Sequence, residues 1–190
     1  MNVQNDLIAR NSKFAATFDK PDMPVLPRLR TVLLACADAR VDPAHVLGLD
    51  LGEVIVIRNT GGRVTRSVIE ELATLSVLAN ILTEGREQGF NVILMQHTQC
   101  GAQRLANPEL QAHLKDSLGI DVSDYAITDQ ASDLMIDVGR LVTASEIPDA
   151  VTVSALLYDV VTGVAEEIAS VKSLGEWRSD PVTPEVDKAS

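Results

Sequence analysis

Three short, uninterrupted runs of mostly branched apolar residues constrain the fold of this chain more than any other feature. They are TVLLA at 31–35, the VIVI of GEVIVIRN at 52–59 and the VILM of NVILMQ at 91–96. Each run is shorter than an ordinary helix and lacks alternation, which is typical of parallel strands covered on both faces. A fourth run, from Val151 to Tyr158, does alternate, and Thr162 with Gly163 offers a turn into VAEEI. These last segments predict a hairpin at the edge of a sheet.

Segments with helical signals separate the apolar runs. A short helix is predicted at 43–49, a longer one from a capping box at Ser67 and Glu70 to about Glu87, and two more at 108–118 and 130–144. Strands that alternate with helices predict an α/β fold with a parallel sheet. Right-handed crossovers are compatible with the strand order 2-1-3, in which the first and third strands are neighbours.

The length of the chain favours a single domain with terminal extensions. The 190 residues are 46% hydrophobic, enough for one substantial core and too few for two. We expect the domain to span 26–172 and residues 173–190 to form an irregular tail. Residues 1–25 carry Leu7, Ile8, Phe14 and Phe18 in a weak amphipathic pattern. That pattern predicts a helical arm that docks on another surface, such as a partner subunit.

Charge and composition argue against several classes of function. The formal net charge of -11 repels nucleic acid and anionic lipid, and aromatic residues, at 3%, are too few for base-stacking platforms. No apolar stretch approaches the roughly 20 residues that cross a bilayer, and the first residues lack a secretory signal. Two cysteines cannot build a disulfide framework. A cytoplasmic protein that acts on a small molecule is therefore expected.

Two short motifs stand at the ends of predicted strands. Cys36 ends the first strand and opens CxDxR, whereas His97 ends the third strand and opens HxxC with Cys100. The carboxyl ends of adjacent parallel strands form the crevice where open α/β sheets bind ligands. Two thiolates and one imidazole suit zinc, and three protein ligands leave a fourth position open for water, as catalytic sites require.

Asp38 and Arg40 complete the predicted site. Thiolate ligands oppose the acidification of a zinc-bound water, so a carboxylate that accepts its proton in a hydrogen bond would help to orient it. Asp38 is placed for that role, and the guanidinium of Arg40 can hold the carboxylate ionised and correctly turned. The sequence thus indicates a zinc hydroxide steered by Asp38 and Arg40.

Two other interpretations of these residues stay open from the sequence. In the first, the cysteines are small buried hydrophobes, His97 is an ordinary loop residue, and Asp38 with Arg40 is a turn ion pair. In the second, His97 activates Cys100 as a nucleophile, which leaves Cys36 without a role. His45 and His113 lie in polar helical segments and are expected at the surface.

Four segments resemble the landmarks of β-class carbonic anhydrases: ACADARVDP, GEVIVIRNTGG, QHTQCG and YDVVTG. The similarity covers about 31 to 169. It implies zinc bound by Cys36, His97 and Cys100, a catalytic pair of Asp38 and Arg40, and reversible hydration of carbon dioxide to bicarbonate. It also implies a parallel sheet in order 2-1-3-4 with an antiparallel edge strand, flanking helices, and a homodimer or dimer of dimers held partly by the N-terminal helical arm.

The resemblance leaves some properties open. In some members the aspartate becomes the fourth zinc ligand in a closed state, so Asp38 is also a conditional metal ligand. Leu33 stands where bicarbonate-regulated members have tryptophan, and Thr60, Gly62 and Gln99 depart from common residues of the family. Relatives with this architecture hydrolyse carbonyl sulfide or carbon disulfide, and a non-catalytic zinc-binding interaction protein is a further alternative.

Overall fold

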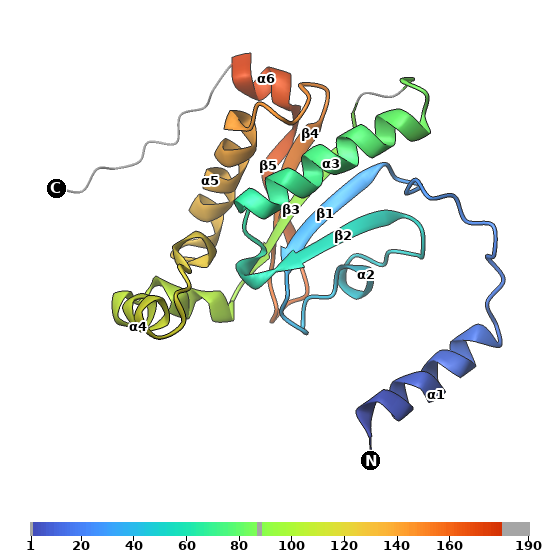
Figure 1. Ribbon diagram of the computed structural model, residues 1–190, viewed down its shortest axis with the longest axis horizontal. Coiled ribbons are helices and arrows are strands. Elements are labelled where there is room, and N and C mark those ends of the chain that lie inside the picture. Colours follow the sequence, from blue (N-terminus) through green and yellow to red (C-terminus); the bar gives the residue numbers. More distant parts are fainter. Residues whose placement is uncertain (1, 87–88, 180–190) are drawn as a thin grey trace.

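A five-stranded sheet forms the centre of the fold (Figure 1), in a computed structural model that describes residues 2–86 and 89–179. The strands are β1 (Thr31–Cys36), β2 (Val54–Asn59), β3 (Asn91–His97), β4 (Thr152–Tyr158) and β5 (Ala165–Ser173). Their order is β2-β1-β3-β4-β5, with an antiparallel pair between β4 and β5 and parallel pairs elsewhere. The predicted α/β class, strand order and antiparallel edge are confirmed.

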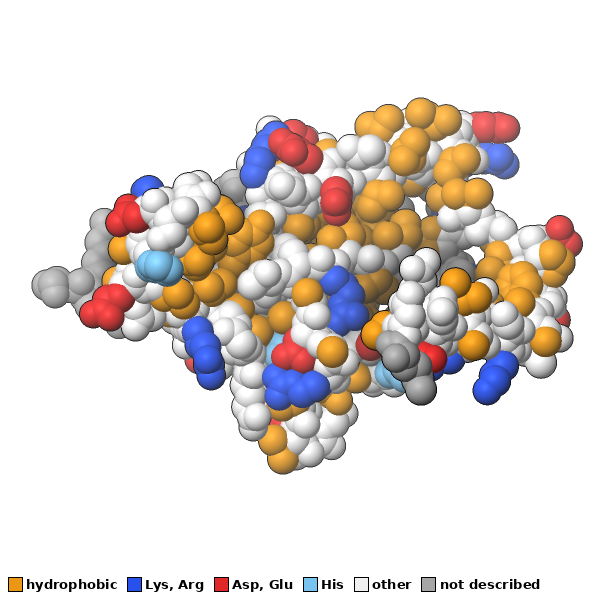
Figure 2. Space-filling model, turned by 60° about the horizontal axis from the view of Figure 1, so that its bottom comes forward, with side chains coloured by type: hydrophobic (Ala, Val, Ile, Leu, Met, Phe, Trp, Pro, Cys, Tyr) orange, Lys and Arg blue, Asp and Glu red, His pale blue; other side chains and the backbone are white. Residues whose placement is uncertain are grey.

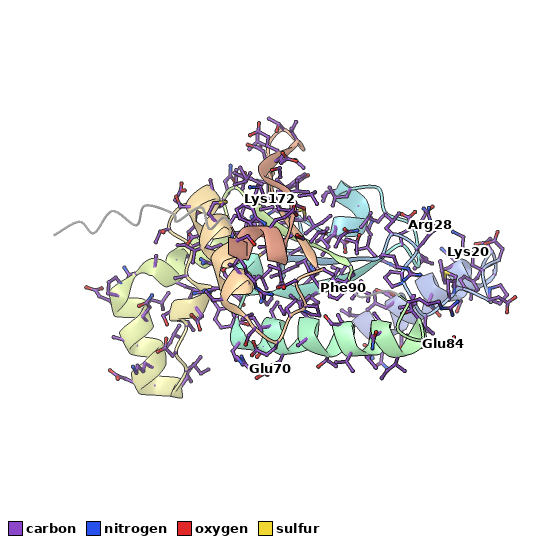
Figure 3. All side chains as sticks on the ribbon, turned by 90° about the horizontal axis from the view of Figure 1, so that it is seen from above. Lys20, Arg28, Glu70, Glu84, Phe90 and Lys172 are labelled. Carbon is purple, nitrogen blue, oxygen red and sulfur yellow. The ribbon has the colours of Figure 1, made fainter. Side chains whose placement is uncertain are left out.

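Helices cover the two faces of the sheet unequally. The helices that follow β1 are α2 (Pro43–Val46), α3 (Arg66–Leu82), α4 (Pro108–Leu118), α5 (Gln130–Thr143) and α6 (Leu174–Ser179), with 3₁₀ turns η1 (Thr60–Gly62), η2 (Gly101–Ala106) and η3 (Ser123–Tyr125). The face covered by α3, α5 and α6 holds the main hydrophobic core. In Figure 3, α3 runs along one side of the sheet, from the region of Glu70 to that of Glu84.

The side chains of β1 explain why the sequence shows no alternation. Val32 and Leu34 point into the main core, whereas Leu33 and Ala35 point to the opposite face, where they pack near α2. All four are buried. Because both faces of a central parallel strand are covered, both sets of positions are apolar.

The irregular tail predicted at 173–190 is wrong for its first residues. Residues 174–179 form α6, which buries Leu174 and Trp177 against the core. Ser173 and Glu176 form a capping box at its start: the Ser173 amide donates to Glu176 Oε2 at 2.7 Å, and the Glu176 amide donates to Ser173 Oγ at 3.1 Å. Residues 180–190 lie outside the described residues.

The beginning and end of α3 also differ from the prediction. The N-cap is Thr65, and the helix ends at Leu82 rather than near Glu87. Glu70 does not reach back to cap the helix in the expected way, because its carboxylate accepts a hydrogen bond from Arg66 Nε at 2.9 Å. A capping box and a surface ion pair can compete for the same glutamate.

The N-terminal arm is helical, as expected. Helix α1 (Val3–Ala15) has no buried residue and stands apart from the sheet in Figure 1. Its apolar side chains are exposed, as Figure 2 shows at the right of the view. They include Val3, Leu7 and Phe14, which share one face of the helix, and the Phe14 ring lies 5.6 Å from that of Phe18. Among the described residues, no helix has the length and apolar character needed to cross a bilayer.

Candidate metal centre

The carboxyl ends of β1 and β3 bring the predicted ligands together. Cys36 is the last residue of β1, His97 is the last residue of β3, and Cys100 follows two residues after the turn at Thr98. The two cysteine Sγ atoms and a ring nitrogen of His97 all lie within 4.8 Å of one another, and the three residues are buried. Residues about sixty positions apart thus meet because β1 and β3 are neighbours.

The geometry of this group fits a tetrahedral metal ion. The two Sγ atoms are 3.7 Å apart, and two sulfurs bound tetrahedrally to zinc at about 2.3 Å each lie about 3.8 Å from one another. His97 Nδ1 lies 2.9 Å from the carbonyl oxygen of Thr98. When Nδ1 carries the proton and donates to that carbonyl, Nε2 has a free lone pair, and this buried atom has no hydrogen-bond partner among the described residues.

The two thiols influence each other's ionisation. Their mutual hydrogen bond lowers the pKa of Cys36 and raises the pKa of Cys100. Backbone amides of Asp38 and Gly61 lower the pKa of Cys36 further, and the amide of Ala102 lowers that of Cys100. The first proton therefore leaves easily, whereas the second leaves only against the charge of the first, so a cation is the natural partner of the fully deprotonated pair.

Asp38 and Arg40 form the predicted pair at the edge of the group. Arg40 Nε donates to Asp38 Oδ1 at 3.0 Å and Nη2 donates to Oδ2 at 2.7 Å. These bonds hold the pKa of Asp38 well below its usual range, so the carboxylate is ionised near neutral pH. Asp38 Oδ2 lies 3.9 Å from His97 Nε2. The structure therefore brings together all five residues that the sequence singled out, while His45 and His113 are exposed and outside the group.

Two backbone features hold the loops around the group. Gly62 has a φ of +64°, and a Cβ at this position would lie 2.9 Å from the Cys36 amide nitrogen, so the turn depends on glycine. Gln99 has a φ of +53°, which is uncommon for a residue with a side chain. Its carbonyl accepts a hydrogen bond from Arg40 Nη2 at 3.0 Å. Arg40 therefore links the loop after β1 with the loop after β3.

A buried ionic network, for which the sequence predicts no role, lies beside the group. Arg63, which is almost fully buried, donates through Nε to Asp137 Oδ2 at 2.8 Å, and its Nη1 lies 2.9 Å from Asp133 Oδ1. Arg140 and Gln96 also donate to Asp137. Burial raises the pKa of Asp137 to about 6, although the neighbouring guanidinium groups act in the opposite direction. The network joins α5 to β3 at the residue before His97.

A second polar group for which the sequence predicts no role lies at the end of β2. Arg58 donates to backbone carbonyls of the loop after β1, and Asn59 Nδ2 donates to the Arg63 carbonyl at 2.8 Å. A signal was present in the sequence: both residues end the strand predicted beside Cys36, where polar side chains face the ligand-binding crevice.

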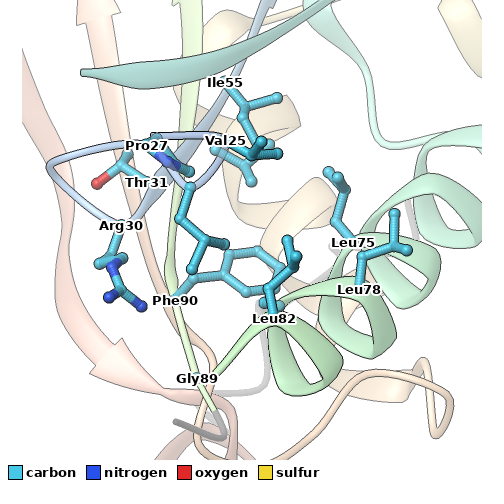
Figure 4. A pocket seen from close by; sticks show the side chains of 13 residues that line it. Val25, Pro27, Arg30, Thr31, Ile55, Leu75, Leu78, Leu82, Gly89 and Phe90 are labelled. Carbon is cyan, nitrogen blue, oxygen red and sulfur yellow. The ribbon is translucent and has the colours of Figure 1, made fainter. Parts of the chain in front are cut away.

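An apolar cavity of about 100 Å³ lies away from the metal centre (Figure 4). Its lining includes Val25, Thr31, Leu75 and Phe90, which place it at the start of β1 and beside α3. Cys36 ends the same strand, so this cavity and the ligand group lie at opposite ends of the sheet. The cavity has no ionisable cluster and takes no part in the candidate chemistry.

Comparison with known proteins identifies the family. The carbonic anhydrase family model matches residues 31–120. β-Carbonic anhydrase 1 of Mycobacterium tuberculosis is 31% identical over 170 residues, which cover 88% of this chain and 99% of the relative. The chain belongs to the β-carbonic anhydrase family. Membership implies a lyase that acts on carbon dioxide and uses a metal ion, in agreement with the Cys36, His97 and Cys100 group.

Solved structures of the family share the fold described above. Carbonic anhydrase of Streptococcus mutans is 30% identical, with a TM-score of 0.73, and the match covers 88% of this chain and 98% of that chain. A carbon disulfide hydrolase is 21% identical with a TM-score of 0.53, covering 85% of this chain and 90% of the other, and shows the fold alone. Another neighbour, from Sordaria macrospora, is described as a tetrameric β-carbonic anhydrase.

Proposed function

We propose that the protein catalyses the reversible hydration of carbon dioxide to bicarbonate at a zinc ion held by Cys36, His97 and Cys100. The observation that carries this proposal is that two thiol sulfurs converge with a ring nitrogen that has no hydrogen-bond partner among the described residues, beside an ionised carboxylate. Zinc, when bound, supplies Lewis acidity that makes a water molecule a nucleophile near neutral pH.

Asp38 and Arg40 serve to orient the nucleophile. The Asp38 carboxylate stays ionised and accepts a hydrogen bond from the attacking water. With this bond made, a lone pair of the water oxygen is directed at the substrate. Arg40 fixes the rotation of this carboxylate through two parallel hydrogen bonds. In a closed arrangement, Asp38 would itself occupy the fourth ligand position, since its Oδ2 lies 3.9 Å from Nε2 of the His97 ring.

Backbone amides moderate the charge of the two thiolates. The N–H groups of Asp38 and Gly61 lower the pKa of Cys36, and that of Ala102 lowers the pKa of Cys100. A polarised N–H group that favours the thiolate also withdraws electron density from the sulfur and so weakens its donation to the metal. These contacts partly offset the loss of Lewis acidity that two anionic ligands cause.

Carbon dioxide is the proposed substrate because the Mycobacterium tuberculosis relative, at 31% identity, is a β-carbonic anhydrase. The carbon disulfide hydrolase is only 21% identical. Hydrolysis of carbonyl sulfide or carbon disulfide requires attack by the same nucleophile on a similar linear molecule, and it is the alternative. Cytoplasmic location stays a prediction; both cysteines are free thiols, as a reducing compartment allows.

Parallel assays on one zinc-loaded preparation test the function. Stopped-flow hydration of carbon dioxide is expected to give kcat/KM above about 10⁴ M⁻¹s⁻¹, the lower range for enzymes, and to exceed sulfide release from carbonyl sulfide and carbon disulfide. Faster sulfide release would assign the hydrolase activity instead. Stoichiometric zinc without turnover of any of the three substrates would identify a non-catalytic zinc-binding protein.

We also propose that residues 1–25 dock on a second copy of the chain. Helix α1 buries none of its residues in its own chain, although Val3, Leu7 and Phe14 form an apolar face. An isolated helix of this length is marginal in water and gains stability by burying such a face. Val77, Leu78, Ile81 and Leu82 of α3 are likewise exposed and offer apolar surface to a partner.

Sedimentation equilibrium tests this assembly. The protein is expected to have a mass of twice or four times the 20.4 kDa chain. Replacing both Leu7 and Phe14 with aspartate is expected to shift the mass to that of the single chain, whereas Asn5→Asp, on the polar face of α1, should leave it unchanged. A wild-type protein that sediments as a monomer would contradict the proposal.

A further inference from the structure

Arg58 makes three polar contacts with the segment that carries the first ligand and the catalytic pair. Its Cα is paired with that of Ala35 in the β1–β2 ladder. From there its Nε donates to the Cys36 carbonyl at 3.0 Å, and Nη2 donates to the Asp38 carbonyl at 2.6 Å. Nη1 donates to Asp42 Oδ2 at 3.4 Å. One partly buried guanidinium thus spans the whole segment from Cys36 to Asp42.

Apart from the bond that Arg40 Nη2 donates to the Gln99 carbonyl at 3.0 Å, most of the other contacts of this segment are local. The Val41 amide donates to the Asp38 carbonyl at 3.2 Å, and the Arg40 amide donates to Asp38 Oδ1 at 2.9 Å. Asp42 Oδ1 caps α2 by accepting from the Ala44 amide. These bonds close the loop on itself, and the Ala37 amide, which donates to the Asn59 carbonyl at 2.8 Å, joins it to β2 only at its start. Beyond Ala37, Arg58 is the side chain of β2 that fixes the loop to the sheet.

We propose that Arg58 is a positioning residue for the reaction, and that it acts by holding the backbone of Asp38. The inference rests on the proposed function. Nε and Nη2 form a planar fork that binds two carbonyl oxygens at a set spacing, those on either side of Ala37. With the Asp38 carbonyl held, its carboxylate stays beside the His97 ring, and Arg40 sets only its rotation. A lysine has one nitrogen and cannot hold both carbonyls in this way.

The test compares Arg58→Lys with Arg66→Gln, a control at an exposed arginine whose ion pairs within the described residues are with Glu70 and Glu146. Zinc content, overall fold and kcat/KM are measured on each. Arg58→Lys is expected to keep stoichiometric zinc and to lose about 10- to 100-fold in kcat/KM, the usual effect of an outer-shell partner. The control variant should match the wild type.

A double-mutant cycle separates positioning from general support of the fold. If Arg58 acts through Asp38, Arg58→Lys should cost little more activity when Asp38 is already alanine. Equal losses in the two backgrounds would overturn the inference, as would wild-type kcat/KM in the single variant. Asp42→Asn, which removes only the third contact, is a milder second variant for the same cycle if the lysine variant does not fold.

Hydrogen exchange provides a readout that does not depend on activity. On zinc-loaded protein, Arg58→Lys is expected to speed exchange of the Arg40 and Val41 amides and to leave the amides of α5 unchanged. Unchanged exchange at Arg40 and Val41 would overturn the inference. If the wild type fails to hydrate carbon dioxide, the proposed function is lost, but this measurement still decides whether Arg58 holds the loop.

Discussion

Replacing His97 with alanine is expected to weaken zinc binding by about 100- to 1,000-fold. Structural zinc sites with four ligands bind with about 10 to 16 kcal/mol, so one ligand accounts for about 2.5 to 4 kcal/mol. His97 is the one neutral ligand of the group. Its Nε2 has no hydrogen-bond partner among the described residues, so metal binding is the role left for this atom. Zinc retained per chain after dialysis against a competing chelator measures the effect, and carbon dioxide hydration should fall with it.

The chain contains two natural controls for this experiment. His45 and His113 are exposed and lie outside the ligand group. Their alanine variants should retain zinc at the wild-type level under the same dialysis. Circular dichroism on each variant shows whether the fold survives. A folded His97→Ala protein that retains one zinc per chain against the chelator would remove His97 from the metal site.

The strands and the ligand group were predictable for a common physical reason. Continuous apolar runs identify the strands, although β2, at the edge of the sheet, is only partly buried. The polar residue that ends each run marks the carboxyl end of its strand. Once β1 and β3 are neighbours, Cys36 and His97 must lie at the same edge of the sheet. Local pattern and topology therefore place the metal ligands without knowledge of any side-chain contact.

The buried network around Arg63 was not predictable in the same way. Its partners, Asp133 and Asp137, lie seventy or more residues away on α5, and no local spacing relates them to the turn after β2. From the sequence, an arginine and two helical aspartates are ordinary surface residues. Only the packing of α5 against β3 makes their burial necessary, and only their mutual pairing makes that burial possible.

Two Ser-x-x-Glu segments show that capping-box spacing alone does not decide where a helix begins. Ser67 and Glu70 have the expected spacing, yet α3 begins earlier, with Thr65 as N-cap, and Glu70 pairs with Arg66. Ser173 and Glu176 have the same spacing and do form the box. The difference lies in tertiary structure, because Trp177 of α6 is buried in the core, which stabilises a helix too short to form alone.

Carbon dioxide hydration is expected to fall by at least about 100-fold in Asp38→Asn, with zinc retained, because proton-accepting groups of this kind typically contribute 10²- to 10⁴-fold. Asparagine keeps the size of the side chain but loses the charge that Arg40 pairs with. The amide can present its N–H₂ group where the carboxylate accepts a hydrogen bond, and then the nucleophile is no longer oriented. Stopped-flow rates, normalised to bound zinc, measure the loss.

The pH dependence of the remaining activity shows whether Asp38 contributes by orienting the nucleophile or by changing its own protonation state. Its pKa is held well below the usual range by Arg40, so the wild-type carboxylate stays charged throughout the neutral and mildly acidic range. Asp38→Asn should therefore lower the rate by a similar factor at pH 6 and pH 9. Asp116→Asn, at an exposed position of α4, should change neither rate. A folded, zinc-loaded Asp38→Asn protein with the wild-type rate would show that the nucleophile is oriented by another group.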